Sequence, residues 1–532
     1  MEKNKSMRNY LKGAKSFIFL LSALCFSASL LASEYIVKYK NKNTFHNNFI
    51  TTYQLNSLEL KDKHDEGLLH LVKVSDSVAK VAIDELRKNS NIEYVVENIK
   101  IEISSTLTND PKINEQWSLK KVNAKKAWGF TPGDPSVVVA VIDTGVDWKH
   151  QDLQKQIWTN PGEIPNNNKD DDGNGFVDDV RGWDFFGNDN NPHDETSARN
   201  PGHGTHCAGI VGASGNNNVG ISGMAQNVSI MPIRFLGADG SGDLMNAVKS
   251  IDYAIKNKAH IISASWGAAV ARKQAAPILE AIERARDQGI VFIAAAANDG
   301  KSNDFREVYP ANAGFSNVIS VAASGPQDEK PSWSNFGRAT VDLAAPGLNI
   351  LSTIPGNSYK NLSGTSMATP LVSGLAALVL SQAKKERKSI SPSELKALLQ
   401  MTSEKVEIET ACGGRVSAGE ALQAFSEDAF ILTPFAKTLA VNDNLNLAAM
   451  NAKGALEFSS SNPEIASVSE KGILTAKAEG QVKIAVRDAK GQESSSENFF
   501  IGKVEAPKSQ CPFQQPQLCQ VMCSINPKLP WC

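Results

Sequence analysis

The hydrophobic pattern changes its period several times along this chain. Residues 137–142 (VVVAVI) are continuously apolar and mostly β-branched, which is typical of a strand buried on both faces of a parallel sheet. A helix is predicted after Asp243, because apolar residues follow it at helical spacing: Leu244, Val248, Ile251 and Ile255. Strand and helix alternate again through residues 261–293, so this region predicts an α/β fold with a parallel sheet flanked by helices.

Regions with other patterns of apolar and polar residues flank this fold. Residues 35–39 and 92–96 are strand-like and enclose a helical pattern, which predicts a small α+β unit before the sheet. Residues 391–394 (SPSE) form a capping box that opens a helix near the end of the α/β region. From about residue 432, short alternating runs separated by turn residues predict a small β-sandwich.

The N-terminus has the pattern of a targeting segment. Basic residues precede an apolar run over residues 17–31, which ends in small residues near Ala32 and Ser33. This pattern predicts a secretory signal peptide over residues 1–33. An uncleaved membrane anchor is the alternative, but serines interrupt the run and it is short for a bilayer span. We therefore expect a secreted protein, periplasmic or extracellular, without a membrane span.

The net charge and the length of the chain limit the kinds of partner that the protein is expected to bind. The chain has 532 residues and a net charge of -2, so it is long enough for several domains and lacks the basic surface that nucleic acid or an anionic membrane would require. We expect no nucleic-acid partner, and we expect a monomer.

Cysteines concentrate at the C-terminus. Four of the seven fall in the last stretch of chain, at positions 511, 519, 523 and 532. In an exported protein this clustering predicts two disulfides, and three pairings are open. A zinc site is the competing interpretation, although no histidine lies among the four.

Three sequence blocks carry the candidate chemistry. VVAVIDTGVD contains Asp143, GHGTHCAGIV contains His203, and SGTSMATPLVSG contains Ser366. Together they resemble the signature blocks of the subtilisin-like serine proteases, over residues 110–425. The preceding α+β unit resembles the propeptide of this family, and residues 433–503 resemble a bacterial immunoglobulin-like (Ig-like) domain. The resemblance implies a subtilisin-like fold, cleavage of polypeptides, and a propeptide that acts as foldase and inhibitor.

The three residues suit one reaction. A serine hydroxyl is a weak nucleophile, so it needs a base to take its proton and a carboxylate to orient that base. Ser366, His203 and Asp143 match these roles, and their chain order differs from the orders of chymotrypsin-like enzymes and α/β-hydrolases. His206 competes as the base, but the family pattern selects His203. An unperturbed imidazole would place the rise of activity at about pH 6 to 7.

The resemblance also assigns the groups around the reacting carbonyl. Asn298 would supply a side-chain donor to the oxyanion and the Ser366 backbone N–H a second donor. Ala297 stands where well-known members carry glycine. An extended peptide would pair with the channel as an added strand. The residues implied to line that channel are Ser265, Trp266, Gly267, Ala296 and Val308.

An acidic loop between the Asp143 and His203 blocks predicts structural Ca²⁺. Its first, third, fifth and sixth positions match a calcium loop, but the twelfth is Arg181, so an earlier aspartate must close the site. A solvated acidic loop is the alternative. The family also implies a second calcium site at Asp152 and Asn217. The ligand residues predicted in the loop are Asp170, Asp172, Asn174, Phe176 and Asp179.

These observations predict five segments and one function. The segments are a signal peptide (1–33), an inhibitory propeptide (34–106), a catalytic domain (107–428), an Ig-like domain (433–503) and a Cys-rich tail (504–532). The function is that of a secreted serine endopeptidase that works through an acyl-enzyme and is made as a self-processed zymogen, cut near residues 104–109. The alternative is a catalytically dead surface binding or adhesion protein that uses its Ig-like domain.

Overall fold

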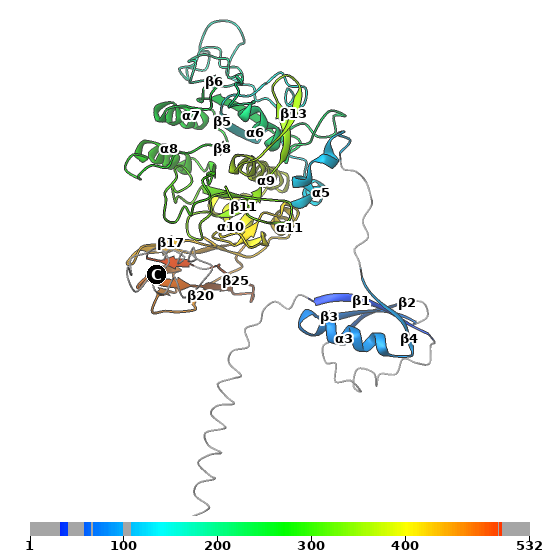
Figure 1. Ribbon diagram of the computed structural model, residues 1–532. Coiled ribbons are helices and arrows are strands. Elements are labelled where there is room, and N and C mark those ends of the chain that lie inside the picture. The colour runs from blue at the N-terminus through cyan, green and yellow to red at the C-terminus, as the bar shows by residue number, and fades with distance from the viewer. Residues whose placement is uncertain (1–31, 41–57, 65–67, 99–107, 498, 503–532) are drawn as a thin grey trace, which may run out of the picture. The chain divides into compact units, whose positions relative to one another are not determined.

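The chain folds into two compact units, Met1–Ser105 and Thr106–Cys532. The computed structural model describes residues 32–40, 58–64, 68–98, 108–497 and 499–502 (Figure 1). Nearly all of the predicted signal peptide and the whole Cys-rich tail, with its predicted disulfides, lie outside the described residues. The first described strand begins at Ala32, so it overlaps the predicted end of the signal peptide by two residues.

The N-terminal unit is an antiparallel sheet with one helix, in agreement with the predicted α+β pattern. The strand order is β2-β3-β1-β4. Buried side chains of the sheet, such as Val37 and Val95, form a core with Ile83 and Leu86 of the helix. The elements are β1 (Ala32–Tyr39), β2 (Leu58–His64), β3 (Leu69–Ser75), α3 (Asp76–Lys88) and β4 (Ile92–Glu97).

The second unit is built on a nine-stranded sheet of order β14-β15-β11-β10-β9-β8-β5-β7-β6, whose strand pairs are parallel apart from β14-β15. This confirms the predicted sheet. The strands are β5 (Val138–Asp143), β6 (Trp183–Asp184), β7 (Ser229–Arg234), β8 (Ile261–Ala264), β9 (Val291–Ala295), β10 (Val318–Ser324), β11 (Leu343–Pro346), β14 (Glu404–Lys405) and β15 (Gly414–Arg415).

Helices cover both faces of this sheet, and β5 shows why its sequence is apolar throughout. Val139 and Val141 belong to the core beneath α6 and α9, whereas Ala140 and Ile142 belong to the core beneath α7 and α8. Successive strand side chains point to opposite faces, so a strand covered on both faces needs apolar residues at every position. The helices are α4 (Trp117–Lys121), α5 (Ala124–Phe130), α6 (His203–Gly212), α7 (Leu244–Lys256), α8 (Ala276–Asp287), α9 (Thr365–Glu386), α10 (Pro392–Met401) and α11 (Ala418–Ser426).

Local signals predicted two helix starts correctly. Asp243 accepts a hydrogen bond from Asn246 N at the start of α7, and Ser391 with Glu394 forms the capping box of α10. Among the described helices, α9 is the one whose length and composition would suit a membrane span, but it packs inside this domain, almost fully buried. A hairpin of β12 (Ile350–Ile354) and β13 (Ser358–Leu362) lies against α6.

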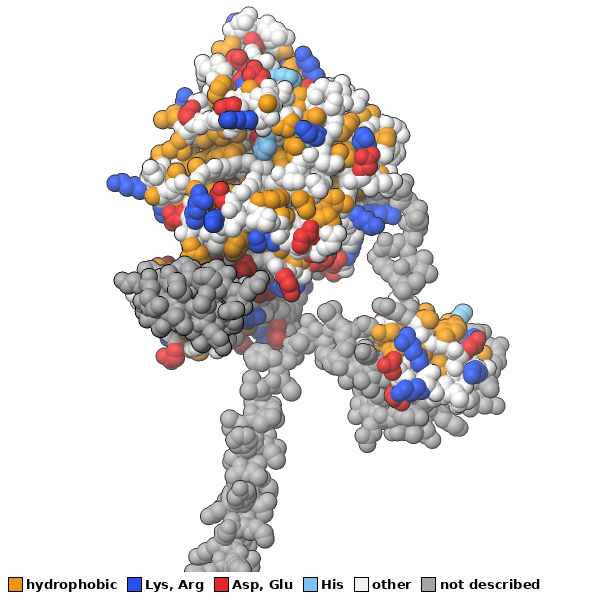
Figure 2. All heavy atoms as spheres, viewed as in Figure 1, with side chains coloured by type: hydrophobic (Ala, Val, Ile, Leu, Met, Phe, Trp, Pro, Cys, Tyr) orange, Lys and Arg blue, Asp and Glu red, His pale blue; other side chains and the backbone are white. Residues whose placement is uncertain are grey.

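The C-terminal part contains short strands around a core of its own, which agrees with the predicted small β-domain. Figure 1 shows it next to α10 and α11. On the face drawn in Figure 2, acidic and basic side chains of the second unit are interspersed. The strands are β16 (Ile431–Thr433), β17 (Thr438–Leu439), β18 (Asn444–Asn446), β19 (Ala448–Met450), β20 (Leu456–Ser460), β21 (Ala466–Val468), β22 (Ile473–Ala476), β23 (Gly480–Val482), β24 (Ile484–Asp488), β25 (Glu493–Ser495) and β26 (Phe499–Ile501).

Candidate active site

Two of the predicted catalytic residues meet at the end of the buried strand. Asp143 is the last residue of β5 and is 1% exposed, and His203 is the first residue of α6. His203 Nδ1 donates to Asp143 Oδ1 at 2.7 Å, and the same oxygen accepts from the Thr144 amide at 2.7 Å. With Nδ1 protonated in this way, Nε2 of His203 is left as the basic nitrogen.

The environment of His203 favours its charged form. Burial opposes a positive charge on the ring, but the Asp143 carboxylate outweighs it and raises the pKa of His203 well above its usual value. The side chain of His203 is still 27% exposed, so it is open to a reactant from solvent.

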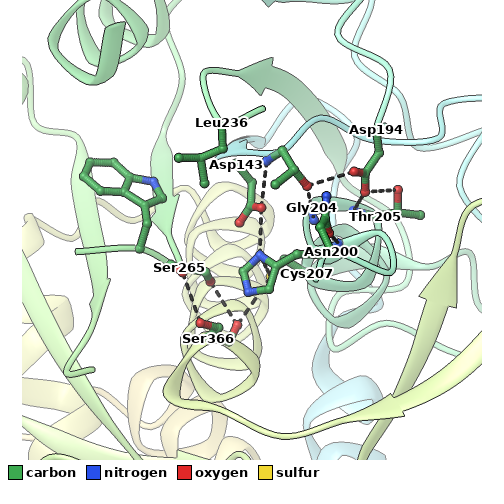
Figure 3. Close-up of polar contacts among 12 residues, drawn as sticks. Asp143, Asp194, Asn200, Gly204, Thr205, Cys207, Leu236, Ser265 and Ser366 are labelled. Carbon is green, nitrogen blue, oxygen red and sulfur yellow. Dashed lines mark hydrogen bonds and ion pairs between the residues drawn. The ribbon is translucent and has the colours of Figure 1, made fainter. Parts of the chain in front are cut away.

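Ser366 lies in the first turn of α9, which packs against α6. Cys207 connects the two helices, because its Sγ lies 3.4 Å from Ser366 O and 3.9 Å from His203 Nδ1 (Figure 3). The Ser366 hydroxyl donates to Ser265 O at 3.1 Å. Across the described residues, no hydrogen bond joins His203 to Ser366, so transfer of the hydroxyl proton to His203 requires a turn of this side chain.

The side chain of Asn298 and the backbone amide of Ser366 lie near each other, beside Gly364. Asn298 Oδ1 accepts from the Thr365 amide at 2.9 Å and from its hydroxyl at 3.0 Å, which fixes the side chain. A methyl group built on Gly364 would lie 3.5 Å from Asn298 Nδ2 and 3.5 Å from Ser366 N. Two nitrogen donors therefore lie near the same point beside the serine, and an oxyanion requires donors placed in this way.

His206 and Cys207 are structural. His206 is fully buried, its Nε2 lies 2.9 Å from Lys360 O, and burial lowers the pKa of its ring to about 3. It therefore stays neutral and does not compete with His203 as a base. Cys207 is a buried free thiol whose pKa is raised by burial.

A buried carboxylate that the sequence analysis did not single out supports the Asp143–His203 pair. Asp194 Oδ1 accepts from the Thr144 hydroxyl at 2.8 Å, and Oδ2 accepts from the Thr205 amide and hydroxyl at 2.8 and 2.7 Å (Figure 3). Burial raises the pKa of Asp194 to about 6. Because these bonds depend on tertiary approach, no local motif marks Asp194.

Four of the five predicted channel residues gather on one side of the serine. Ser265 contacts Ser366 through its hydroxyl and its carbonyl oxygen. The Trp266 indole N–H donates to Ile142 O at 2.7 Å. A methyl group on Gly267 would lie 3.2 Å from Val308 Cγ1, so these two backbone segments are close neighbours.

Ala296, the fifth predicted channel residue, is anchored inside the domain. Its side chain is fully buried, its N–H donates to Val321 O at 3.0 Å, and its C=O accepts from Asn303 Nδ2 at 3.0 Å. Both backbone groups of Ala296 are thus bonded inside the domain, and its place in the substrate channel stays a prediction.

The acidic loop brings two of the predicted carboxylates, Asp172 and Asp179, together with Glu163, which the sequence analysis did not single out. Oxygens of Glu163, Asp172 and Asp179 lie within 4.8 Å of one another. Asp170 lies outside this cluster and holds the turn, accepting from the amides of Asn174 and Gly175 at 3.0 and 2.7 Å. Glu163 comes from the preceding turn, outside the twelve-residue pattern.

The remaining loop residues fix this cluster in place. The side-chain amide of Asn174 donates to Asp172 and Asp179 at 3.1 and 3.0 Å. The Phe176 ring packs against Tyr253, whose hydroxyl donates to Asp179 at 2.5 Å. Burial raises the pKa of Asp179 to about 6, despite these hydrogen bonds and with the charge of Asp172 adding to the rise.

The second implied calcium site also has its predicted residues together. Asn217 Nδ2 donates to Asp152 Oδ1 at 2.7 Å, and Tyr359 donates to Asp152 Oδ2 at 2.9 Å. Asp110, which the sequence analysis missed, accepts from the amides of Asn216 and Asn217, each at 3.1 Å.

A parallel sheet with an Asp–His pair at one strand end, a serine at a facing helix start and two convergent N–H donors defines the class of serine hydrolases. Comparison with known proteins narrows the class. The family model "Subtilase family" matches residues 134–426, and "Bacterial Ig-like domain (group 2)" matches residues 437–498. The chain belongs to the subtilase family and is a serine endopeptidase.

Relatives support this placement. The chain is 36% identical over 321 residues to thermitase of Thermoactinomyces vulgaris, which covers 59% of this chain and 99% of the relative. It is 35% identical over 324 residues to the thermophilic serine proteinase of Bacillus sp. (strain AK1), covering 61% and 70%. A solved structure of proteases from Pseudoalteromonas arctica PAMC 21717 is 29% identical, with a TM-score of 0.50, and covers 60% of this chain and all of that chain.

Proposed function

We propose that this endopeptidase cleaves polypeptides through an acyl-enzyme formed on Ser366. The observation that most directly supports this proposal is the 2.7 Å contact between Asp143 and His203, beside a serine at a helix start. As the Ser366 oxygen attacks a peptide carbonyl, His203 Nε2 takes the hydroxyl proton and then gives it to the leaving amine. Water attacks the resulting ester by the same route in reverse.

Asn298 and the Ser366 amide are the proposed donors to the oxyanion of each tetrahedral intermediate. Donors fixed before the reaction need no reorganisation when charge develops, so they stabilise the transition state more than the bound substrate. Thr365 supplies this fixation, since it holds the Asn298 carbonyl oxygen and leaves the NH₂ group directed to the site.

Replacement of the serine tests the assignment. We expect the S366A chain to fold with an unchanged melting temperature, to accumulate at full length, and to lose casein hydrolysis by a factor of about 10⁴ or more. It should also fail to react with a fluorophosphonate probe. S363A, which alters an exposed serine three residues away, is the matched control and should process and react normally. Processing by S366A, or labelling of it, would remove Ser366 as the nucleophile. An unlabelled parent chain would favour the dead binding protein.

The N-terminal unit is the proposed intramolecular inhibitor. Its strand β4 leaves two large apolar side chains exposed, Tyr94 at 42% and Val96 at 45%. Apolar side chains on one sheet suit a surface that binds another domain. The proposal includes export of the chain and removal of this unit by self-cleavage.

Calcium is the proposed structural ion of the acidic loop. Glu163 supports the assignment, because its Oε2 is buried and has no hydrogen-bond partner within the described part of the chain. Hard cations prefer oxygen ligands, and three clustered carboxylates without a paired Lys or Arg among the described residues fit Ca²⁺. The residues that would hold the ion are Glu163, Asp172 and Asp179. Asp152, Asn217 and Asp110 are proposed for the second site.

A further inference from the structure

The C-terminal Ig-like domain shares its first strand with the core of the protease. Ile431 and Met450 pair across β16 and β19, and both belong to the same buried cluster as Phe425 of α11. Leu432, the next residue, belongs instead to the core of the Ig-like domain. Because successive side chains point to opposite faces, β16 has one face on each domain. The two domains are therefore packed together.

Two polar contacts add to this junction. Lys437 Nζ donates to Gly314 O at 2.6 Å, and the Thr438 hydroxyl donates to Ala339 O at 3.2 Å. Lys437 is half-buried, and burial, with the charge of Lys396, lowers its pKa to about 8. A partly desolvated ammonium needs its hydrogen bond, so this contact restrains Gly314.

An open pocket lies beside these contacts. It has a volume of about 470 Å³ and is lined by Arg338 and Ile408 of the catalytic domain and by Glu497 and Phe500 of the Ig-like domain. Side chains that face each other across this solvent-accessible space make no dispersion contacts with each other. The polar contacts of Lys437 and Thr438 therefore carry a larger share of the restraint on that side.

The two carbonyl groups that accept these bonds, Gly314 O and Ala339 O, belong to loops that are hydrogen-bonded to two consecutive residues. Gly314 ends a loop whose Asn312 donates to Asn303 O at 2.8 Å. Ala339 N donates to Asp304 Oδ1 at 3.1 Å, and this carboxylate oxygen holds the rest of the same turn. The two contacts from the Ig-like domain thus converge on Asn303 and Asp304.

Asn303 in turn fixes the backbone around Asn298. Its Nδ2 donates to Ala296 O at 3.0 Å, and its Oδ1 accepts from Asn335 Nδ2 at 2.9 Å. Asn335 bonds both neighbours of Asn298: its N–H donates to the residue before at 3.0 Å, and its Oδ1 accepts from the residue after at 2.9 Å. The segment that presents Asn298 is therefore held from behind by a chain of hydrogen bonds.

We propose that the Ig-like domain braces the oxyanion segment of the protease, with Lys437 and Thr438 as the positioning residues that transmit this support. The proposal rests on the proposed role of Asn298. Small displacements of a preorganised donor are costly in the transition state, whereas substrate binding uses other contacts. Loss of the brace therefore lowers kcat more than it raises KM.

The test compares mature enzymes made from the full chain. The variant K437M/T438V removes both contacts. K477M is the matched control, because Lys477 donates to Pro463 O at 3.1 Å within the Ig-like domain itself. With a peptide anilide substrate we expect kcat of K437M/T438V to fall about five-fold or more, with KM nearly unchanged. K477M should match the parent in both constants.

Hydrogen exchange provides a readout that needs no activity. In the S366A background, the K437M/T438V change should speed amide exchange of residues 296–304, and K477M should leave it unchanged. Unchanged kcat together with unchanged exchange would overturn the proposal. If the double variant does not accumulate, T438V alone takes its place, because valine and threonine have nearly the same shape. Both kcat and the amide exchange rates should then change in the same direction as in the double variant, but by less. Failure of the proposed function would instead appear as a parent enzyme that the fluorophosphonate does not label.

Discussion

One short contact determines how acid should affect this enzyme. In the proposed mechanism His203 acts as a base in its neutral form, but the carboxylate 2.7 Å away stabilises the protonated ring. The effect exceeds the opposing effect of burial, so the pKa of His203 lies well above its usual value. The sequence alone placed the rise of activity at about pH 6 to 7, because an isolated imidazole titrates there.

We therefore expect the acid limb of kcat/KM to lie above about pH 6.5. A protonated His203 cannot take the serine proton, and a raised pKa keeps it protonated to higher pH. The same shift makes the folded state more stable below the unfolded pKa, a contribution lost as pH rises through the folded value. Rates with an uncharged peptide anilide across pH 5 to 9 check this. A midpoint at or below that of free imidazole would contradict it.

Ala297 shows what a single residue contributes to such geometry. Its φ is +87°, a backbone conformation that favours glycine, and it directly precedes Asn298. An L-residue held there costs about 1 to 3 kcal/mol, which the surrounding structure must offset. The Thr365 hydroxyl accepts from its N–H at 3.2 Å, and its C=O accepts from Asn335 N–H at 3.0 Å. The strain is thus located where the oxyanion donor is presented.

Elements whose signals are local could be predicted, and those that depend on distant partners could not. The α7 cap and the α10 capping box involve residues three apart, so the sequence revealed both. The two-residue strands β6, β14 and β15 have no period of their own and exist because the sheet edge pairs with them. Glu163 was missed for a different reason, since it lies close in sequence to the acidic loop but outside the twelve-residue calcium-loop pattern.

For the acidic loop we predict that the effect of one substitution on Tm depends on whether calcium is bound. With Ca²⁺ present, E163Q removes one ligand and should lower Tm by at least about 2 °C. In a chelator, the same change removes repulsion between clustered carboxylates, so E163Q should be at least as stable as the parent. Calorimetry in both conditions measures the crossover. E280Q, on the exposed side of α8, is the control. A chelator that leaves the parent Tm unchanged would contradict the calcium site.

The boundary between the two compact units is where the proposed self-cleavage would separate the propeptide from the protease. The sequence placed the cut near residues 104–109, and the two compact units divide between Ser105 and Thr106. Much of the predicted range lies outside the described residues. The described part nevertheless restricts it, because Thr108 and Asp110 are both buried in the second unit.

We expect the mature enzyme to begin at or before Thr108. The Asp110 carboxylate accepts from the Thr108 hydroxyl and from the amides of Asn216 and Asn217, and Asn109 Oδ1 accepts from Asn218 N at 2.9 Å. A bond must leave the folded domain and extend through the active site to be cut, so cleavage inside this anchored segment would first break those contacts. N-terminal sequencing of the processed protein measures the site. A first residue at or beyond Asn109 would contradict the expectation, and a first residue beyond Asp110 would also remove Asp110 from the proposed second calcium site in the mature form.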